Sequence, residues 1–466
     1  MQHSGVVSAF HAVALCSKVE HIYLKAIQEH ITRDALQSFP GMNHQRLRTL
    51  HLDLSGSLVE QGVLCLLLRS ITDGRVPRLT DLALNLQTNR YIEPGEMDCF
   101  SLLLSPSFYL ERLTLILSGT TWDGDRVLAG CRSWANRPSV LRSLTLHLGE
   151  TGVSDWGIVS CMPTILAAHP NLEKLALHFN HSEIHTRRGL NVLVNSITKL
   201  QSLRSLDMNV SNCGLQDSGV WRFLGLLSQL RQLSLDISYN RRIQYRTKSA
   251  ICELLGMLRH TMASFRLWGT HTFLPNQYPG PGCGPLHLHT LSLSVPVLHG
   301  DGVPDLLRSC DTSTVNRVQI SFTGSKVGYQ GCRRLGFLLM RFSCLQSVYL
   351  DLDGNDVRDV GAHCLFQSLS EISSLSHLTL HLSYNDLTVC SMRSLCSLLV
   401  KPLVALFIDL SGNPLGYDGV RCICNAVRRH NPTVSLPWRV ILRHVSIINP
   451  LQYHELLERL PCGVQM

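Results

Sequence analysis

Two histidines at matching positions are the side chains of this sequence that come nearest to a chemical site. His147 and His178 occupy the same place in the similar segments LTLHL and LALHF. If these segments are neighbouring strands of a parallel sheet, their backbones lie about 4.8 Å apart, close enough for two imidazoles to share a metal ion. A metal site needs a further ligand, and only Asn209 follows at the next matching position. Two solvated histidines are therefore expected, and no metal site is predicted.

The signatures of common catalytic and nucleotide-binding sites are missing from the sequence. It contains no GxxxxGK[ST] phosphate loop, no HExxH zinc motif, no GxSxG nucleophile elbow and no kinase signature. The glycines of the segment GPGCG follow no strand-to-helix pattern. No catalytic residue and no cofactor are predicted, and a non-enzymatic protein is expected.

The elements that position these side chains are set by a repeated motif, LxxLxLxL. Its first apolar residue stands at positions 47, 79, 110, 141, 172, 203, 230, 262, 288, 315, 345, 375 and 403. Steps of this size are typical of stacked repeats. The alternation of leucines predicts a strand in each copy, with Leu50 and Leu52 on one face and Thr49, His51 and Asp53 on the other. After the strand, an apolar residue followed four positions later by glycine predicts a helix, as in Val153/Gly157, Val357/Gly361 and Leu415/Gly419.

These motifs resemble the ribonuclease-inhibitor-like class of leucine-rich repeats, in which LxxLxLxxN precedes a loop, a glycine and a helix. The resemblance covers residues 47 to about 430. It implies an α/β solenoid of about 13 repeats, curved like a horseshoe, with a parallel sheet on the concave face and helices on the convex face. The class asparagine is matched by Asn89, Asn240, Asn355, Asn385 and Asn413. In the class this side chain bonds the backbone inside the loop, so a structural role is implied.

Segments outside and inside the array depart from the repeat. Residues 1–46 contain the helically spaced segment VSAFHAVALCSKVEHIYLKAIQEHI, which predicts an N-terminal helical cap to the array at 47–430. Residues 431–466, with strand-like WRVILRHVSII and helix-like LQYHELLERL, are predicted to form a C-terminal cap. Residues 268–286 hold four prolines and four glycines where other repeats have a helix, which predicts an irregular loop. An eroded repeat explains it as well as a functional feature does, either a recognition loop or a crease in the solenoid.

The net charge of +8 does not gather on the predicted concave face. The outward positions of the thirteen strands hold four Lys or Arg and six Asp. Binding of a phosphate backbone is therefore disfavoured, and no nucleic-acid partner is predicted. The basic segment NRRIQYRTK, residues 240–248, is expected in a loop, either as a solvated run or as a contact for an acidic partner.

The sequence favours an intracellular location, in the cytoplasm, without a membrane contact. No apolar run approaches the roughly 18 residues of a membrane helix. The N-terminal stretch VVSAFHAVALC lacks a cationic start and contains His11, which disfavours a secretory signal. Many cysteines fall between strands, where buried helices are predicted and Cys acts as a small hydrophobe; they are Cys65, Cys131, Cys161, Cys252, Cys310, Cys332, Cys364, Cys396 and Cys422.

Three aromatic residues are expected on the concave face: Trp268, Tyr349 and Phe407. Large rigid rings on a surface of small polar residues are usual anchors of protein interfaces, although a ring on a strand can also pack on its neighbours. With these three, the charged residues Arg266, Asp351 and Asp409 complete the predicted partner-binding site. The predicted function is a scaffold that binds a protein partner on the concave face and adjoining loops.

Two other functions fit the same architecture. GTPase-activating proteins built on similar repeats regulate an enzyme, but the acidic C-terminal tail typical of them is absent here. The substrate-receptor subunit of a ubiquitin ligase would need a helical adaptor-binding motif, which residues 1–46 do not clearly supply.

Overall fold

The computed structural model forms two compact units, Met1–Ala250 and Ile251–Met466. The residues that it describes are 12, 18–34, 45–60, 62–72, 76–89, 100–103, 109–136, 140–184, 186–215, 230–240, 263–268, 285–294, 307–308, 310–322, 326–430, 437–447, 449–458 and 460–466. The predicted loop at 268–286 and the basic segment at 240–248 therefore lie almost wholly outside the described residues, as does Cys252.

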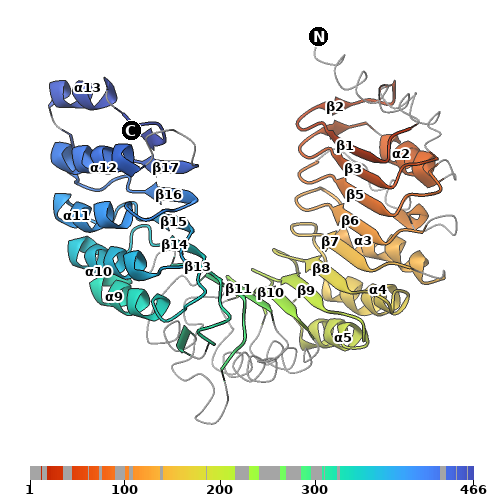
Figure 1. Ribbon diagram of the computed structural model, residues 1–466. Coiled ribbons are helices and arrows are strands. Elements are labelled where there is room, and N and C mark those ends of the chain that lie inside the picture. Colours follow the sequence, from red (N-terminus) through yellow and green to blue (C-terminus); the bar gives the residue numbers. More distant parts are fainter. Residues whose placement is uncertain are drawn as a thin grey trace. The chain divides into compact units, whose positions relative to one another are not determined.

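The described part of the first unit is built on a parallel sheet whose strands pair in chain order (Figure 1). Its strands are β1 (His21–Lys25), β3 (Thr49–Asp53), β5 (Asp81–Asn85), β6 (Arg112–Ile116), β7 (Ser143–His147), β8 (Lys174–His178), β9 (Ser205–Asn209) and β10 (Gln232–Asp236). Two short strands, β2 (His30–Ile31) and β4 (Leu58–Val59), pair separately. One face of the main sheet is covered by α2 (Val63–Thr72), α3 (Gly124–Cys131), the 3-10 helix η4 (Arg132–Asn136), α4 (Asp155–Ala167) and α5 (Arg187–Ile197).

The second unit repeats this plan. Its described strands are β11 (Ser264–Trp268), β12 (Thr290–Ser294), β13 (Arg317–Ser321), β14 (Ser347–Asp351), β15 (His377–His381), β16 (Ala405–Asp409), β17 (Trp438–Ile441) and β18 (Val464–Gln465). The helices are α9 (Gly328–Leu339), α10 (Arg358–Glu371), α11 (Val389–Leu398), α12 (Gly416–His430) and α13 (Pro450–Glu458). In both units we call the sheet face opposite the helices the open face.

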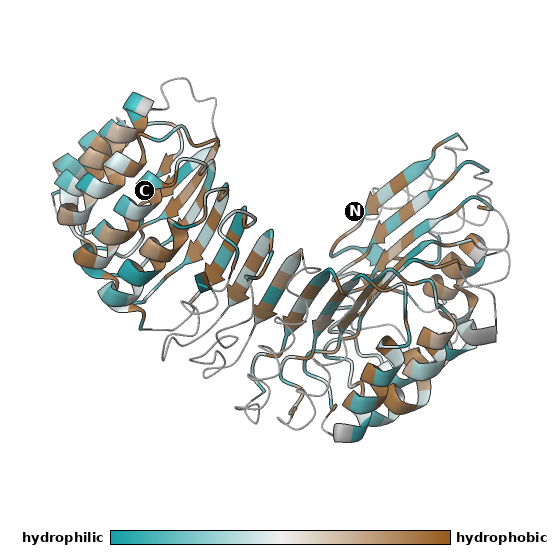
Figure 2. Cartoon of the chain, turned by 60° about the horizontal axis from the view of Figure 1, so that its bottom comes forward, coloured by the Kyte–Doolittle hydropathy of each residue, from teal (hydrophilic) through white to brown (hydrophobic). Residues whose placement is uncertain are grey.

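Alternation along each strand separates the core from the open face. Leu50, Leu52 and Leu54 are exposed by 0%, 2% and 1%, whereas His51 and Asp53 stay half-buried on the open face. Figure 2 shows the same alternation as hydrophobic and hydrophilic bands along the strands. Full burial of a leucine contributes about 1.5–3 kcal/mol, so each repeat adds its own share of core. All thirteen strands predicted from LxxLxLxL are present, as β3 and β5 to β16, which confirms the predicted α/β repeat.

The helical prediction for the N-terminal segment is wrong for residues 21–25, which form strand β1 and pair in parallel with β3. The physical reason is the alternation Ile22, Leu24, which places both side chains toward the core while His21, Tyr23 and Lys25 face outward. At the other end, the strand-like and helix-like segments form β17 and α13, and β17 pairs with β16. Strands of both predicted caps thus extend the sheets, although the domain boundaries at 46 and 431 remain predictions.

Several cysteines in the helices are buried as apolar side chains, whereas Cys65, Cys364, Cys396 and Cys422 are only half-buried. Cys131, Cys161 and Cys332 lie in α3, α4 and α9, and burial raises the pKa of Cys332 to about 12. Cys310 is the exception to the predicted placement, because it forms a β-bridge with Leu286 instead of lying in a helix. It is nevertheless buried, and its pKa is also raised to about 12.

Of the described helices, none is both long enough and apolar enough to span a bilayer.

Candidate functional site

The register of the sheets aligns the outward side chains into columns, as the sequence predicts. In the second unit, Tyr349 pairs with Gln319 on one side and with Thr379 on the other, and Thr379 pairs with Phe407. The next column contains Asp351, His381 and Asp409 in neighbouring strands. Residues far apart in sequence therefore meet on one surface.

Three rings gather on strands β14, β15 and β16 and form what we call the aromatic cluster: Tyr349, His381 and Phe407. The ring centroids of Tyr349 and His381 are 5.4 Å apart, and those of His381 and Phe407 are 4.9 Å apart. All three side chains are half-buried. Burial raises the pKa of the Tyr349 hydroxyl, and Asp351 adds to the shift, so the tyrosine stays neutral. His381 was not among the predicted site residues, although it occupies one of the predicted outward positions.

The two predicted carboxylates beside the cluster, Asp351 and Asp409, belong to the last residues of strands β14 and β16. Asp351 accepts hydrogen bonds from the backbone N–H of Asp353 at 3.3 Å and from the Ser321 hydroxyl at 2.8 Å. Asp409 accepts from the backbone N–H of Ser411 at 2.9 Å and from its hydroxyl at 2.5 Å. A bond to the backbone two residues on is an Asx turn. The same bond recurs at Asp53, Asn85, Asn209 and Asp236.

The structure separates Trp268 and Arg266 from the aromatic cluster. Both lie on β11, where Trp268 is half-buried and Arg266 is exposed. Strands β12 and β13 stand between β11 and β14. Three strand spacings amount to about 14 Å. The six predicted residues thus divide into two groups on one face.

On the open face of the first unit, the histidines are neighbours as the register predicts, but they are half-buried and stacked, so the expectation of two solvated side chains is wrong. The rings of His147 and His178 stack with centroids 3.8 Å apart and 7° between their planes. His178 Nε2 lies 3.5 Å from a carboxylate oxygen of Asp207. Burial and, to a smaller extent, the neighbouring His178 lower the pKa of His147 to about 4, so His147 is neutral at pH 7. Burial opposes the charge on Asp207, but hydrogen bonds from His178 and Ser234 outweigh it and lower the pKa.

The stacked arrangement does not aim the ring nitrogens at a common point. Stacked rings direct their nitrogens outward along the ring edges, whereas two ligands of one metal ion must point toward it. Within the part of the chain that the structure describes, no three His, Cys, Asp or Glu side chains form a metal-binding group.

Tyr23 is a surface residue that the sequence reasoning missed. It is 69% exposed on β1, and its ring meets that of His51 edge-on at 4.9 Å. Both line a shallow hollow of about 230 Å³ on the open face. His51 also approaches a carboxylate oxygen of Asp81 at 3.2 Å, and Arg112 lies 2.9 Å from the other oxygen. The signal was present in the sequence, because Val19, Ile22, Leu24 and Ala26 repeat the apolar spacing LxxLxLxL.

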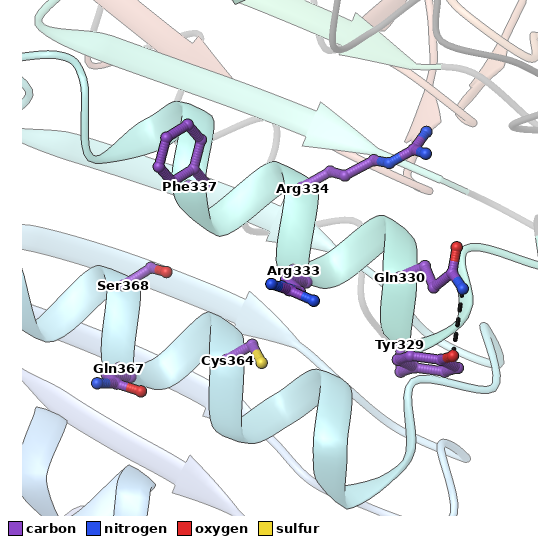
Figure 3. A pocket seen from close by; sticks show the side chains of 8 residues that line it. All are labelled: Tyr329, Gln330, Arg333, Arg334, Phe337, Cys364, Gln367 and Ser368. Carbon is purple, nitrogen blue, oxygen red and sulfur yellow. Dashed lines mark hydrogen bonds between the residues drawn. The ribbon is translucent and has the colours of Figure 1, made fainter.

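A groove on the helical side of the second unit was also not predicted. It runs between α9 and α10 and has a volume of about 590 Å³. Figure 3 shows its lining, to which α9 contributes most of the side chains. The eight lining residues are Tyr329, Gln330, Arg333, Arg334, Phe337, Cys364, Gln367 and Ser368.

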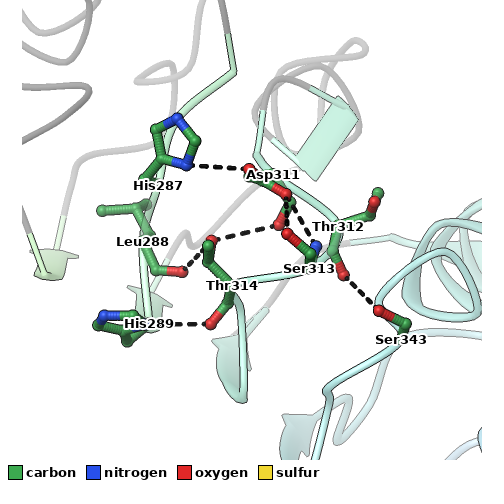
Figure 4. Close-up of polar contacts among 8 residues, drawn as sticks. All are labelled: His287, Leu288, His289, Asp311, Thr312, Ser313, Thr314 and Ser343. Atoms are coloured by element: carbon green, nitrogen blue, oxygen red, sulfur yellow. Dashed lines mark hydrogen bonds and ion pairs between the residues drawn. The ribbon is translucent and has the colours of Figure 1, made fainter.

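A polar cluster before strands β12 and β13 contains Ser, His and Asp side chains (Figure 4). Asp311 accepts from the Ser313 backbone at 2.8 Å and from its hydroxyl at 2.7 Å, and it lies 2.9 Å from Nδ1 of His287. The Ser313 N–H is the main reason that the pKa of Asp311 is lowered. Because the serine donates to the aspartate and not to the histidine, the group lacks the nucleophile-to-base contact of an acyl-transfer site. Thr314 donates to the Leu288 carbonyl at 3.0 Å, so the cluster ties successive repeats together.

Comparison with protein-family models gives no match. Among curated proteins, the chain is 26% identical over 378 residues to the ribonuclease inhibitor of Mus musculus, which covers 78% of this chain and 70% of that relative. The repeated parallel strands and helices agree with this similarity. The chain is a leucine-rich repeat protein that resembles the ribonuclease-inhibitor-like class.

These leucine-rich repeats are also similar to parts of other proteins. The human NACHT, LRR and PYD domains-containing protein 13 is 24% identical over 402 residues, which covers 84% of this chain. Since only 34% of that relative is aligned, the chain spans about a third of its length. A chain in the crystal structure of the yeast Rad7 and Elc1 complex has a TM-score of 0.45 and 16% identity, and the match covers 76% of this chain and 80% of that one.

The asparagines of the leucine-rich repeat are fully buried and bonded to backbone. Asn385 donates to the carbonyls of Leu352 at 2.7 Å and Ser383 at 3.0 Å, and it accepts from the N–H of Asn355 at 2.9 Å. Asn413 continues the ladder by accepting from the Asn385 N–H at 2.9 Å. The implied structural role of these residues is confirmed, so none of them is available to a ligand.

Proposed function

We propose that this leucine-rich repeat protein is a non-enzymatic scaffold that binds a protein partner on the open face of its second unit. The aromatic cluster is the observation that carries the proposal. Its three half-buried rings lie together on a surface that otherwise consists mainly of small and polar side chains. Rigid rings lose little conformational entropy on binding and shed water from a large area, which is why they dominate many interfaces.

The groups around the cluster suggest what it contacts. Asp351 and Asp409 flank His381, and their carboxylates would attract a basic side chain of the partner. The exposed Arg439 lies opposite Phe407 in the register and would contact an acidic side chain of the partner. The partner therefore presents an apolar anchor with charges of both signs around it. Trp268 and Arg266 supply a second, separate contact on β11.

A regulator of an enzyme is the second candidate, and the similarity to a ribonuclease inhibitor favours it. Regulation of an enzyme is itself protein binding, so the two candidates share the open face and differ in the effect on the partner. The direct test adds the purified chain to a pancreatic-type ribonuclease and measures the cleavage rate. Slower cleavage, relieved by Tyr349→Ala and Phe407→Ala together, would support this candidate; an unchanged rate at micromolar concentration would remove ribonuclease from consideration.

The scaffold proposal is tested by quantitative affinity capture from native cells with isotope-labelled samples. The wild-type chain is compared with the double variant Tyr349→Ala, Phe407→Ala. The matched control is Thr114→Ala, Thr145→Ala, which changes the same strand position on β6 and β7 of the first unit. We expect at least one protein that the control retains and the double variant loses tenfold or more. Equal capture by all three chains would contradict the proposed site.

A further inference from the structure

The groove between α9 and α10 has the chemistry of a second binding site, on the face opposite the aromatic cluster. We propose that it binds an acidic segment of a partner protein in extended conformation, with an apolar residue on each side of a central carboxylate. The site goes beyond the scaffold function and does not depend on the open face.

The charge of the groove is positive. Helix α9 reads GYQGCRRLGFLL, with two arginines and no acidic residue, and none of the eight described residues that line the groove is a carboxylate. Figure 3 shows Arg333 between the two helices near Cys364, whereas Arg334 extends away from α10. Arg333 forms no ion pair with any described residue. A carboxylate of a partner would therefore meet an arginine whose charge is not already neutralised nearby.

Two acidic residues near the start of α10, Asp356 and Asp359, are engaged by other groups. Asp359 in the first turn of α10 accepts from the backbone N–H of Thr388 at 2.8 Å and from its hydroxyl at 2.6 Å. Asp356 lies 2.6 Å from Nε of Arg358. These contacts engage both carboxylates, and Glu371 at the C-terminal end of α10 is not among the residues that line the groove, so the lining keeps its positive charge.

Two exposed rings bound the groove along α9. Tyr329 is 48% exposed and Phe337 is 67% exposed, and the Gln330 amide donates to the Tyr329 hydroxyl at 3.2 Å. Close packing of the two helices makes the floor, because a Cβ at Gly361 would lie only 2.9 Å from the Tyr329 Cα. Aromatic residues and arginine are enriched in protein interfaces, so this combination fits a contact surface.

The spacing along the helix determines the pattern of the occupant. Tyr329, Arg333 and Phe337 follow one another at steps of four residues, which places them in one stripe along α9. The Cα atoms of the two aromatic residues are thus about 12 Å apart along the helix axis, at a rise of 1.5 Å per residue. In an extended peptide, residues i, i+2 and i+4 face one side, and the outer two are about 13 Å apart. A peptide with an apolar residue at i, an acidic residue at i+2 and an apolar residue at i+4 would therefore place one side chain against each of Tyr329, Arg333 and Phe337.

Fluorescence anisotropy with the full chain and the capped, fluorescein-labelled peptide Leu-Ser-Glu-Ser-Leu tests this site. We expect it to bind at least tenfold more tightly than Leu-Ser-Lys-Ser-Leu. Arg333→Glu should weaken binding of the glutamate peptide at least tenfold and reverse the preference toward the lysine peptide. Phe337→Ala, which removes an exposed ring and no core contact, should weaken binding about threefold or more.

The matched control is Arg393→Glu, which makes the same charge change at an exposed position of α11 outside the groove. It should change affinity less than twofold. Equal losses in the Arg333 and Arg393 variants would show a general charge effect and overturn the site. So would the absence of any preference between the two peptides, or self-association of the wild-type chain that Arg333→Glu abolishes. The capture test of the open face uses other residues, so the two proposals fail separately.

Discussion

The open faces of the two units have the same arrangement of parallel strands. They differ in the contacts that their outward side chains make. In the first unit, charged and titratable groups contact one another across strands, as in His51 with Asp81 and His178 with Asp207. In the second unit, the exposed residues Arg266, Arg317 and Arg439 form no ion pair with any described residue, and three rings lie between β14 and β16.

This difference matters for binding because contacts within a face compete with contacts to a partner. A partner on the first face would have to replace these contacts between strands before it gained anything. A partner on the second face covers rings that water solvates poorly and meets charges that are still unpaired. The comparison predicts that binding energy concentrates on the second unit.

The largest expected effect follows from removing the aromatic cluster. With a partner identified by capture, Tyr349→Ala together with Phe407→Ala should weaken affinity roughly 100-fold, the size of two interface anchors. Because His381 contacts both rings, the two single effects should not add. Calorimetric titration of the single and double variants measures this coupling. Strict additivity would show that the three rings do not act as one cluster.

Acid should weaken the first unit through its buried neutral histidines. His169 is 1% exposed, has no hydrogen-bond partner for either ring nitrogen among the described residues, and its pKa is lowered by burial to about 4. The unfolded chain takes up this proton near pH 6.5, so stability is complete above that pH and is lost as pH falls toward 4.

Substitution of His169→Leu should therefore reduce the loss of stability between pH 7.5 and pH 5 by about 2 kcal/mol. Urea unfolding of the wild type and the variant at both pH values gives the comparison. Parallel pH dependences of the two proteins would contradict the burial of a neutral imidazole.

A smaller effect is expected from Trp268, which lies three strands from Tyr349. Trp268→Ala should weaken partner affinity about fivefold, as for a peripheral anchor. Its effect should add to that of Tyr349→Ala within about 0.5 kcal/mol, because the two sites share no contact. Strong coupling between the two substitutions would instead indicate that one side chain of the partner contacts both Trp268 and Tyr349.

The smallest change in affinity is expected from Asp409→Ala. Its carboxylate holds the turn after β16 through Ser411, so the variant should lose about 1 kcal/mol of stability and less than twofold in affinity. Thermal unfolding and binding measured on the same sample separate the two effects. A tenfold loss of affinity would make Asp409 a principal contact of the partner rather than a weak electrostatic one.

The sequence predicts the strands well because alternation with a buried face permits one register. The same signal was present in Ile22 and Leu24 of β1, but helical spacing in the surrounding residues masked it. The turn that Asp409 stabilises is indicated in the sequence by the serine two positions later. The contacts of His381 with Tyr349 and Phe407 depend on side-chain rotamers, which the sequence pattern does not give. The groove on α9 arises from the distance between two helices, which Gly361 permits and no single motif encodes.

The central claim is that a partner sits on the open face of the second unit, and site-specific photocrosslinking tests it directly. A benzoylphenylalanine is placed in the living cell at Tyr349 and, in a separate chain, at Thr145, the matching position on β7 of the first unit. We expect a covalent adduct with a distinct protein from position 349 and none from position 145. An adduct from position 145 with none from position 349 would contradict it.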